Sequence, residues 1–297
     1  MLGYYSVWTC PTCSNKISKQ KRGEIQHAIG KHAKDGGETL LITITNSHCR
    51  TDDLKTMVQA QMKAMNRFAG ATRTQKIYKK VGHIGSIRAW EVTHGNNNGW
   101  HPHFHVLLFV GKGVDREKLQ QDLFNQWANA CRLAKLPEPN EEHGLRIDGG
   151  DNAAAYITKW NLSQEVTQGH MEVTKGNIKN SRKKSRTPLD LIRDYEINDD
   201  KQAGALFIEF AGAFKGKRQL CWSSKLKEHF KIDEFKEAVE KEKEEEWDLI
   251  GRIERADWKL VVKYRKRFDV LMIAEKLGME GVEQLLVKLR GGRKLQI

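Results

Sequence analysis

Two strand-like runs around a short polar segment restrict the fold of this chain more than any other feature. Residues 84–93 and 100–110 are rich in β-branched, aromatic and aliphatic side chains, and residues 94–99 between them hold three asparagines and two glycines. Asparagine and glycine adopt the positive-φ conformations that tight turns need. The pattern therefore predicts a β-hairpin, which joins antiparallel strands.

Helical and strand-like patterns alternate around this hairpin. A strand-like run at 40–45 precedes a helical pattern at 54–68, and a helical pattern at 115–135 precedes a short strand at 144–147. Because the hairpin strands are antiparallel and helices interrupt the strands, we predict an α+β fold. Its central antiparallel β-sheet is flanked by helices.

We divide the chain into four regions. Residues 1–37 form an amino-terminal segment with a candidate zinc site, and 38–162 form the α+β core. Residues 163–187 form a basic loop, and 188–297 form a mostly helical carboxy-terminal region that would bind DNA or a protein partner.

The charge balance favours a polyanionic partner. The chain has 51 Lys+Arg against 38 Asp+Glu, a formal net charge of +13, and such an excess favours contacts with phosphates. In the basic loop the candidate DNA-binding side chains are Lys175, Lys179, Arg182, Lys183, Lys184 and Arg186. An ordinary solvated linker would have a similar composition.

The chain shows no secretory signal and no apolar run as long as a membrane helix, and its five cysteines are an odd, scattered set. We therefore expect a protein of the bacterial cytoplasm with reduced thiols and no membrane partner.

Histidines alternate along the second hairpin strand. Because strand side chains point to opposite faces in turn, His101, His103 and His105 share one face, and Glu91 lies alongside on the preceding strand. Imidazoles and a carboxylate with open coordination positions suit Mn²⁺ or Mg²⁺, which would polarise a phosphate oxygen. We predict Glu91, His103 and His105 as ligands. His101, which Pro102 separates from His103, is expected to be a neighbour of the metal.

A candidate nucleophile follows the metal motif. Tyr156 and Lys159 lie three residues apart on one face of a predicted helix, after the alanines at 153–155. A tyrosine hydroxyl that attacks phosphorus would form a covalent phosphotyrosine, and a nearby lysine would stabilise the negative charge. An aromatic residue after alanines is more often part of a core, so the assignment depends on the metal site.

Four residues near the amino terminus have the spacing of a zinc site. Cys10, Cys13, His27 and His32 follow the pattern Cys-x2-Cys-x13-His-x4-His, which matches known zinc-ligand spacings. They predict a structural Zn²⁺ ion. The alternative is two unrelated cysteines and two histidines on a helix surface.

Taken together, these motifs resemble the HUH endonucleases, and specifically the plasmid rolling-circle replication initiators with one catalytic tyrosine. The string His101 to Leu108 resembles the metal motif of that family. Residues 43–48, 155–159 and 214–223 resemble its other motifs in order and spacing, so that the resemblance covers about 40–225.

The resemblance implies a nick in a single-stranded or hairpin plasmid origin, with Tyr156 joined to the 5′ phosphate. The free 3′ hydroxyl would prime a host DNA polymerase, a host helicase would open the duplex, and the ends would later be rejoined. Relatives often have a glutamate four residues before the tyrosine for the terminating step. Here that position is Asn152, and the neighbouring Asp151 is a candidate substitute base.

Two other functions fit the same residues. A non-catalytic zinc-containing DNA-binding protein would bind DNA without covalent capture. A relaxase or transposase would share the chemistry, but relaxases commonly have their tyrosine before the metal motif, whereas Tyr156 follows His105. The order therefore favours an initiator.

Overall fold

The computed structural model describes residues 7–149, 185–237 and 251–291, and the chain divides into two compact units, Met1–Lys236 and Glu237–Ile297. In chain order, the elements of the first unit are α1 (Pro11–Lys34), β1 (Glu38–Ile44), α2 (Leu54–Gly70), α3 (Thr72–Lys80), β2 (Gly85–Gly95), β3 (Gly99–Val110), α4 (Arg116–Leu133), β4 (Leu145–Asp148), β5 (Ser185–Arg186), α7 (Pro188–Asn198), α8 (Lys201–Phe214), β6 (Leu220–Trp222) and α9 (Leu226–His229). The second unit contains α11 (Arg255–Lys263) and α12 (Arg267–Arg290).

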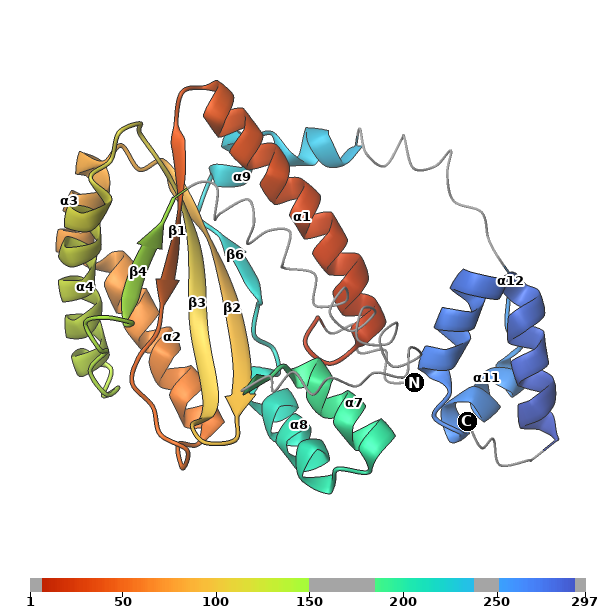
Figure 1. The fold of residues 1–297 in the computed structure, drawn as a ribbon. Helices are drawn as coiled ribbons and strands as arrows, with labels where there is room; N and C mark the ends of the chain where they lie inside the picture. Colours follow the sequence, from red (N-terminus) through yellow and green to blue (C-terminus); the bar gives the residue numbers. More distant parts are fainter. Residues whose placement is uncertain (1–6, 150–184, 238–250, 292–297) are drawn as a thin grey trace, which may run out of the picture. The chain divides into compact units, whose positions relative to one another are not determined.

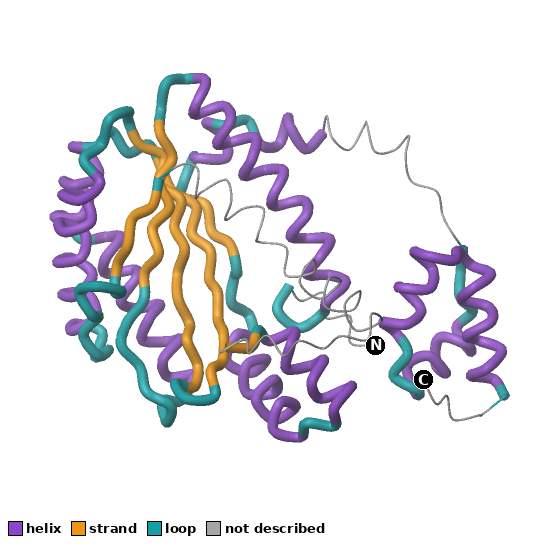
Figure 2. The backbone as a smooth tube through the Cα atoms, in the orientation of Figure 1, coloured by secondary structure: helices purple, strands orange, loops and turns teal. Residues whose placement is uncertain are grey.

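The strands of the first unit form one antiparallel sheet. Its order is β4-β1-β3-β2-β5, and β6 also pairs with β2. Helices lie on either side of the strands (Figure 2). This arrangement confirms the predicted α+β fold with flanking helices.

The predicted hairpin is present as β2 and β3. Its register pairs Gly95 with Gly99 at the turn and Glu91 with His103 further along. Gly99 has φ +71°, and a Cβ there would lie 2.9 Å from the backbone of Arg50. Glycine is therefore required at this turn for both its conformation and its size.

Side-chain caps determine where several helices begin. Asp53 accepts a hydrogen bond from the Thr56 amide at the start of α2, and Asp115 accepts one from the Lys118 amide at the start of α4. Each carboxylate satisfies an amide that has no partner within its helix. α7 begins with a capping box between Thr187 and Asp190.

The two faces of β3 meet different surroundings. One face contributes to the main core under α2, α4 and α8, and its side chains there are Trp100, Phe104, Val106, Leu108 and Val110. On the other face, Leu107 and Phe109 pack with Ile25 and Ala28 of α1 and with Phe230 after α9. The remaining half of that second face carries the histidines.

The sheet extends beyond the predicted core of 38–162. β5 pairs with the His94 end of β2, and β6 pairs with residues 87–89 of the same strand. The predicted amino-terminal segment of 1–37 holds α1, which packs on this sheet (Figure 1). Apolar side chains of α1 and β6 pack on the sheet, whereas β5 joins it through backbone pairing with β2.

The second unit has a small core of its own. Val261 of α11 packs with Val270, Val282 and Leu286 of α12. Gly278, with φ +64°, interrupts the helical backbone within α12. In the part of the chain that the structure describes, no helix is long and apolar enough to cross a membrane.

Candidate metal centre

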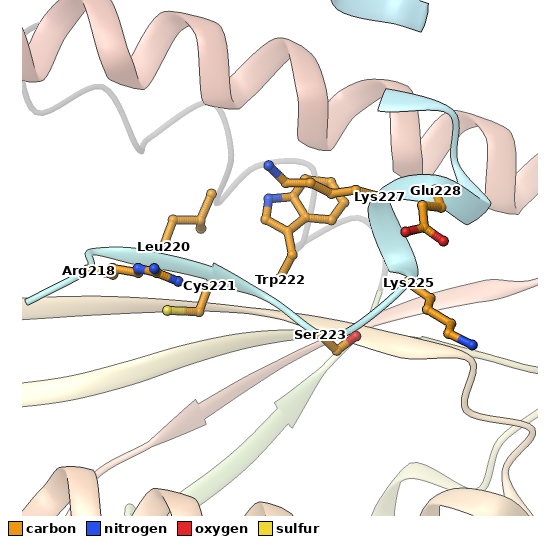
Figure 3. A pocket seen from close by; sticks show the side chains of 8 residues that line it. All are labelled: Arg218, Leu220, Cys221, Trp222, Ser223, Lys225, Lys227 and Glu228. Carbon is orange, nitrogen blue, oxygen red and sulfur yellow. The ribbon is translucent and has the colours of Figure 1, made fainter. Parts of the chain in front are cut away.

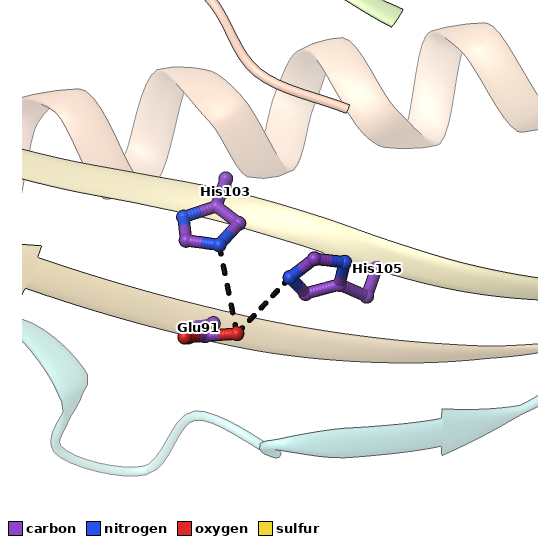
Figure 4. A group of neighbouring side chains, drawn as sticks. All are labelled: Glu91, His103 and His105. Carbon is purple, nitrogen blue, oxygen red and sulfur yellow. Dashed lines mark ion pairs between the residues drawn. The ribbon is translucent and has the colours of Figure 1, made fainter. Parts of the chain in front are cut away.

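Three side chains of the hairpin converge on one point. The Nε2 atoms of His103 and His105 lie 3.6 and 3.0 Å from the same carboxylate oxygen of Glu91 (Figure 4). The three donor atoms all lie within 4.8 Å of one another, and these residues are the metal-type cluster found in the described ranges. The register produces this arrangement, because Glu91 pairs with His103 and Ala89 pairs with His105.

The hydrogen bonds of the rings orient them for metal binding. Nδ1 of His103 lies 3.2 Å from the carbonyl oxygen of His101, and a carbonyl only accepts, so the Nδ1 proton donates to it. In the neutral ring Nε2 then carries a lone pair that points at the Glu91 carboxylate. A lone pair facing an anion is stabilised when a cation lies between them.

The electrostatics favour the protonation states that bind a metal. Burial lowers the pKa of His105, which keeps the ring neutral. Burial would raise the pKa of Glu91, but the adjacent His103 and His105 more than offset it and hold that pKa well below its usual range. The site therefore presents an ionised carboxylate at Glu91 and a neutral imidazole at His105, the forms that ligate divalent ions.

Thr43 of β1 contacts His105, the second histidine of the candidate metal group. Its hydroxyl lies 3.1 Å from Nδ1 of His105, and the two residues are paired across β1 and β3. A hydrogen bond to the distal ring nitrogen fixes the orientation of a ligating histidine. Sequence reasoning noted Thr43 only within a motif, because its contact depends on a strand that lies far away in the chain.

We expect Thr43→Val to weaken Mn²⁺ binding by about tenfold, since losing an outer hydrogen bond typically costs 10–100-fold in metal affinity. Isothermal titration calorimetry measures this change. Thr39→Val is the matched control, because the buried Thr39 hydroxyl has no hydrogen-bond partner among the described residues. Equal Mn²⁺ affinities of the two variants would contradict a positioning role for Thr43.

His101 lies next to the candidate metal group and is not one of its three members. Its ring contacts that of His103 at 4.9 Å between centroids and that of His48 at 4.7 Å. Burial, followed by the neighbouring His103 and His48, lowers the pKa of His101 to about 4. His101 and His48 thus extend the row of imidazole rings beyond the candidate ligands.

A buried glutamine connects the strand of the histidines to helix α2. Nε2 of Gln61 donates to the Pro102 carbonyl at 2.7 Å and to Oδ1 of Asn46 at 2.5 Å. Sequence reasoning missed this residue. The signal was present, because Gln61 falls at helical spacing on the apolar face that includes Leu54 and Val58, where a polar side chain needs a partner.

Comparisons with known proteins identify the family of this chain. A model of the family described as "Replication protein" matches residues 6–270 of the chain. The chain belongs to this family.

Several curated relatives are similar to parts of the chain. The protein rep of Streptomyces lividans is 25% identical over 291 residues, which cover 76% of this chain and 63% of the relative. The protein rep of Lentilactobacillus hilgardii is 24% identical over 72% of this chain and 67% of the relative. A neomycin resistance protein of Streptomyces cyanogenus is 30% identical over 38% of this chain and 31% of the relative. The chain therefore spans less than two thirds of either Streptomyces relative, and no solved structure matches it.

The structure of this replication protein corrects the predicted zinc site. Cys13, His27 and His32 all lie in α1, and a helix rises about 1.5 Å per residue, which separates Cys13 from His27 by roughly 20 Å along the axis. His27 and His32 instead contact the carbonyl oxygens of Phe230 and Val110. The four residues, Cys10 included, therefore do not share one metal ion. The two histidines attach α1 to the body of the replication protein.

Arg186, one of the predicted DNA-binding residues, forms ion pairs within the first unit. Its guanidinium lies 3.4 Å from a carboxylate oxygen of Asp194 and 3.1 Å from one of Asp200, and the side chain is only 22% exposed. These contacts link β5 to α7 and to the start of α8, and DNA binding by Arg186 stays a prediction. The other predicted DNA-binding residues, Lys175, Lys179, Arg182, Lys183 and Lys184, lie outside the described residues, as do Asp151, Tyr156 and Lys159.

Proposed function

We propose that this replication protein initiates plasmid replication by nicking a single-stranded or hairpin origin. Tyr156 would be the nucleophile and Glu91, His103 and His105 the metal ligands. The convergence of these three ligands on one face of the hairpin is the observation that carries the proposal. Membership of the replication protein family supports it.

The donor set fits a divalent cation. Two imidazole nitrogens and one carboxylate leave open positions for water and phosphate oxygens, as in sites for Mn²⁺ or Mg²⁺. When bound there, such an ion would supply Lewis acidity at an oxygen of the scissile phosphate. Thr43 and the His101 carbonyl would keep the ligand rings in position, since each contacts an Nδ1 atom.

The proposed reaction is a transesterification. The Tyr156 hydroxyl loses its proton, its oxygen forms a bond to phosphorus, and the bond from phosphorus to the 3′ oxygen breaks. The 3′ oxygen takes up a proton and becomes the hydroxyl that primes a host DNA polymerase. The 5′-phosphotyrosine keeps the energy of the broken bond, so that the ends can be rejoined.

Other side chains have proposed supporting roles. Lys159 would stabilise charge on the phosphate, and Asp151 would activate water in the terminating step. The lysines and arginine between 175 and 184 would follow the DNA backbone. A host helicase would be a further partner, and the site of action would be the bacterial cytoplasm.

Covalent capture tests the proposal. The chain is incubated with a library of single-stranded oligonucleotides and Mn²⁺, and DNA-linked peptides are identified by mass spectrometry. We expect a metal-dependent adduct on the peptide that contains Tyr156. DNA binding without an adduct, at any metal concentration, would favour the non-catalytic DNA-binding protein. An adduct on another tyrosine would overturn the assignment of the nucleophile.

A further inference from the structure

A basic pocket with an aromatic wall lies where β6 leads into α9. It encloses about 350 Å³ (Figure 3). Its lining residues are Arg218, Leu220, Cys221, Trp222, Ser223, Lys225, Lys227 and Glu228. The lining thus combines one indole ring with three cations and a single carboxylate, that of Glu228 in α9.

The floor of the pocket is firmly attached to β2. The Ser86 amide donates to Oγ of Ser223 at 2.9 Å, and the Ser223 amide donates to the Ser86 carbonyl at 2.9 Å. A Cβ at Gly85 would lie 2.6 Å from the Leu226 side chain. This close packing preorganises the pocket, which lowers the entropic cost of binding a ligand.

Trp222 has the surroundings of a ring that stacks on nucleic-acid bases. The ring is only partly buried, and Nζ of Lys227 lies 5.7 Å from its centroid. Its Nε1 atom is buried and has no hydrogen-bond partner among the described residues. An indole beside cations is the combination by which proteins hold single-stranded nucleic acid, through stacking and phosphate contacts.

The charges around the ring would be compensated by an anionic ligand. Arg218 and Lys225 are exposed, and Lys225 adopts φ +62°, a conformation that non-glycine residues rarely take. Burial lowers the pKa of Lys227, and the nearby Lys21 lowers it further. A phosphate in this pocket would be attracted by the cations that line it.

The pocket and the metal centre share strand β2. Leu220 of β6 pairs with Ala89, which itself pairs with His105 on its other side. The Gln219 carbonyl accepts a hydrogen bond from the amide of Trp90, the residue before Glu91. Adjacent β-strands lie about 4.8 Å apart. A single strand of DNA bound at the candidate metal centre would therefore need only a short stretch of its backbone to reach the pocket.

We propose that this pocket holds a nucleotide of single-stranded DNA that flanks the scissile phosphate. The base stacks on Trp222, and Arg218 and Lys225 contact the phosphates. This proposal rests on the proposed nicking function, because that function places a single strand at the metal centre. The pocket is thus a binding subsite for the substrate strand.

Binding of a fluorescein-labelled oligothymidylate, measured by anisotropy in EDTA, tests the subsite without any cleavage. We expect Trp222→Ala to weaken binding by about ten- to a hundredfold, the range found for loss of one stacked base, and Trp222→Phe to restore most of it. Arg218→Gln and Lys225→Gln should each lower the slope of log K against log salt by about 0.7. Lys112→Gln, an exposed cation on the turn after β3, should leave the slope unchanged.

The outcomes separate the two proposals. One outcome would overturn the subsite and leave the nicking function standing: the unmodified chain forms the covalent adduct, but the variants Trp222→Ala, Arg218→Gln and Lys225→Gln bind DNA as tightly as it does. The opposite outcome would support the subsite and overturn the nicking function: the variants bind DNA more weakly, but the unmodified chain forms no covalent adduct. A third outcome also overturns the proposal. If only Arg218→Gln and Lys225→Gln weaken DNA binding, and they weaken binding of a polyglutamate probe by the same factor, the pocket is a general polyanion patch.

Discussion

Replacing Glu91 by glutamine is expected to lower Mn²⁺-dependent cleavage of single-stranded DNA by more than about a hundredfold. The amide has the shape of the carboxylate but lacks its charge, and Glu91 is the anionic member of the group that includes His103 and His105. Loss of an outer-shell contact already costs 10–100-fold in metal affinity or activity, so loss of a direct ligand should cost more.

Thermal unfolding gives a second readout that does not depend on cleavage. At a Mn²⁺ concentration about a hundredfold above Kd, a ligand that binds only the folded chain stabilises it by about 2.7 kcal/mol. We expect this stabilisation in the wild type and its loss in Glu91→Gln. Glu38→Gln is the matched control, because Glu38 is a carboxylate of the same sheet that pairs with Arg116 at 2.7 Å, away from the histidines. Full Mn²⁺ stabilisation of Glu91→Gln would contradict its role as a ligand.

Replacing Tyr156 by phenylalanine is expected to abolish the covalent adduct with DNA. The ring keeps its size, but the oxygen that would form the bond to phosphorus is removed, and no rate remains for that step. Denaturing electrophoresis of the chain with a labelled origin strand and Mn²⁺ measures the adduct. Binding of the same strand in EDTA should change little, because stacking and phosphate contacts do not use the hydroxyl.

Tyr264→Phe provides the control for the tyrosine experiment. Tyr264 is 38% exposed and lies in the second compact unit, so that its hydroxyl is expected to have no part in the reaction. The adduct should form at the wild-type rate in this variant. An undiminished adduct in Tyr156→Phe would show that another side chain is the nucleophile.

The sequence predicted the parts of the metal centre that depend on local periodicity. Alternation along a strand places His103 and His105 on one face, and the Gly/Asn segment at 94–99 brings Glu91 beside them. Both relations act over a few residues of one hairpin. The helical spacing of the apolar residues in α2 is a local signal of the same type.

Contacts between segments that lie far apart in the chain did not follow from the spacing of residues in the sequence. His27 and His32 have zinc-like spacing in the sequence, but a continuous helix holds Cys13 far from them. Their Nε2 atoms instead contact backbone carbonyl oxygens of other segments. Arg186 belongs to a basic stretch, but Asp194 and Asp200 compensate its charge. Linear spacing predicts a site only when the intervening chain can turn back on itself.

The sequence by itself determined the antiparallel hairpin, the face that its histidines share and the helices that cover the sheet, because periods of two and of 3.6 residues are properties of the backbone. Only the tertiary structure decided that Thr43 contacts His105, that β6 pairs with β2 and that one pocket brings Trp222 and three cations into the same lining. These contacts join residues far apart in the chain, and they depend on which strand edges and apolar faces pack together. The histidine pair was therefore predictable from a few residues, whereas its supporting threonine and the adjoining pocket required the whole first unit to fold.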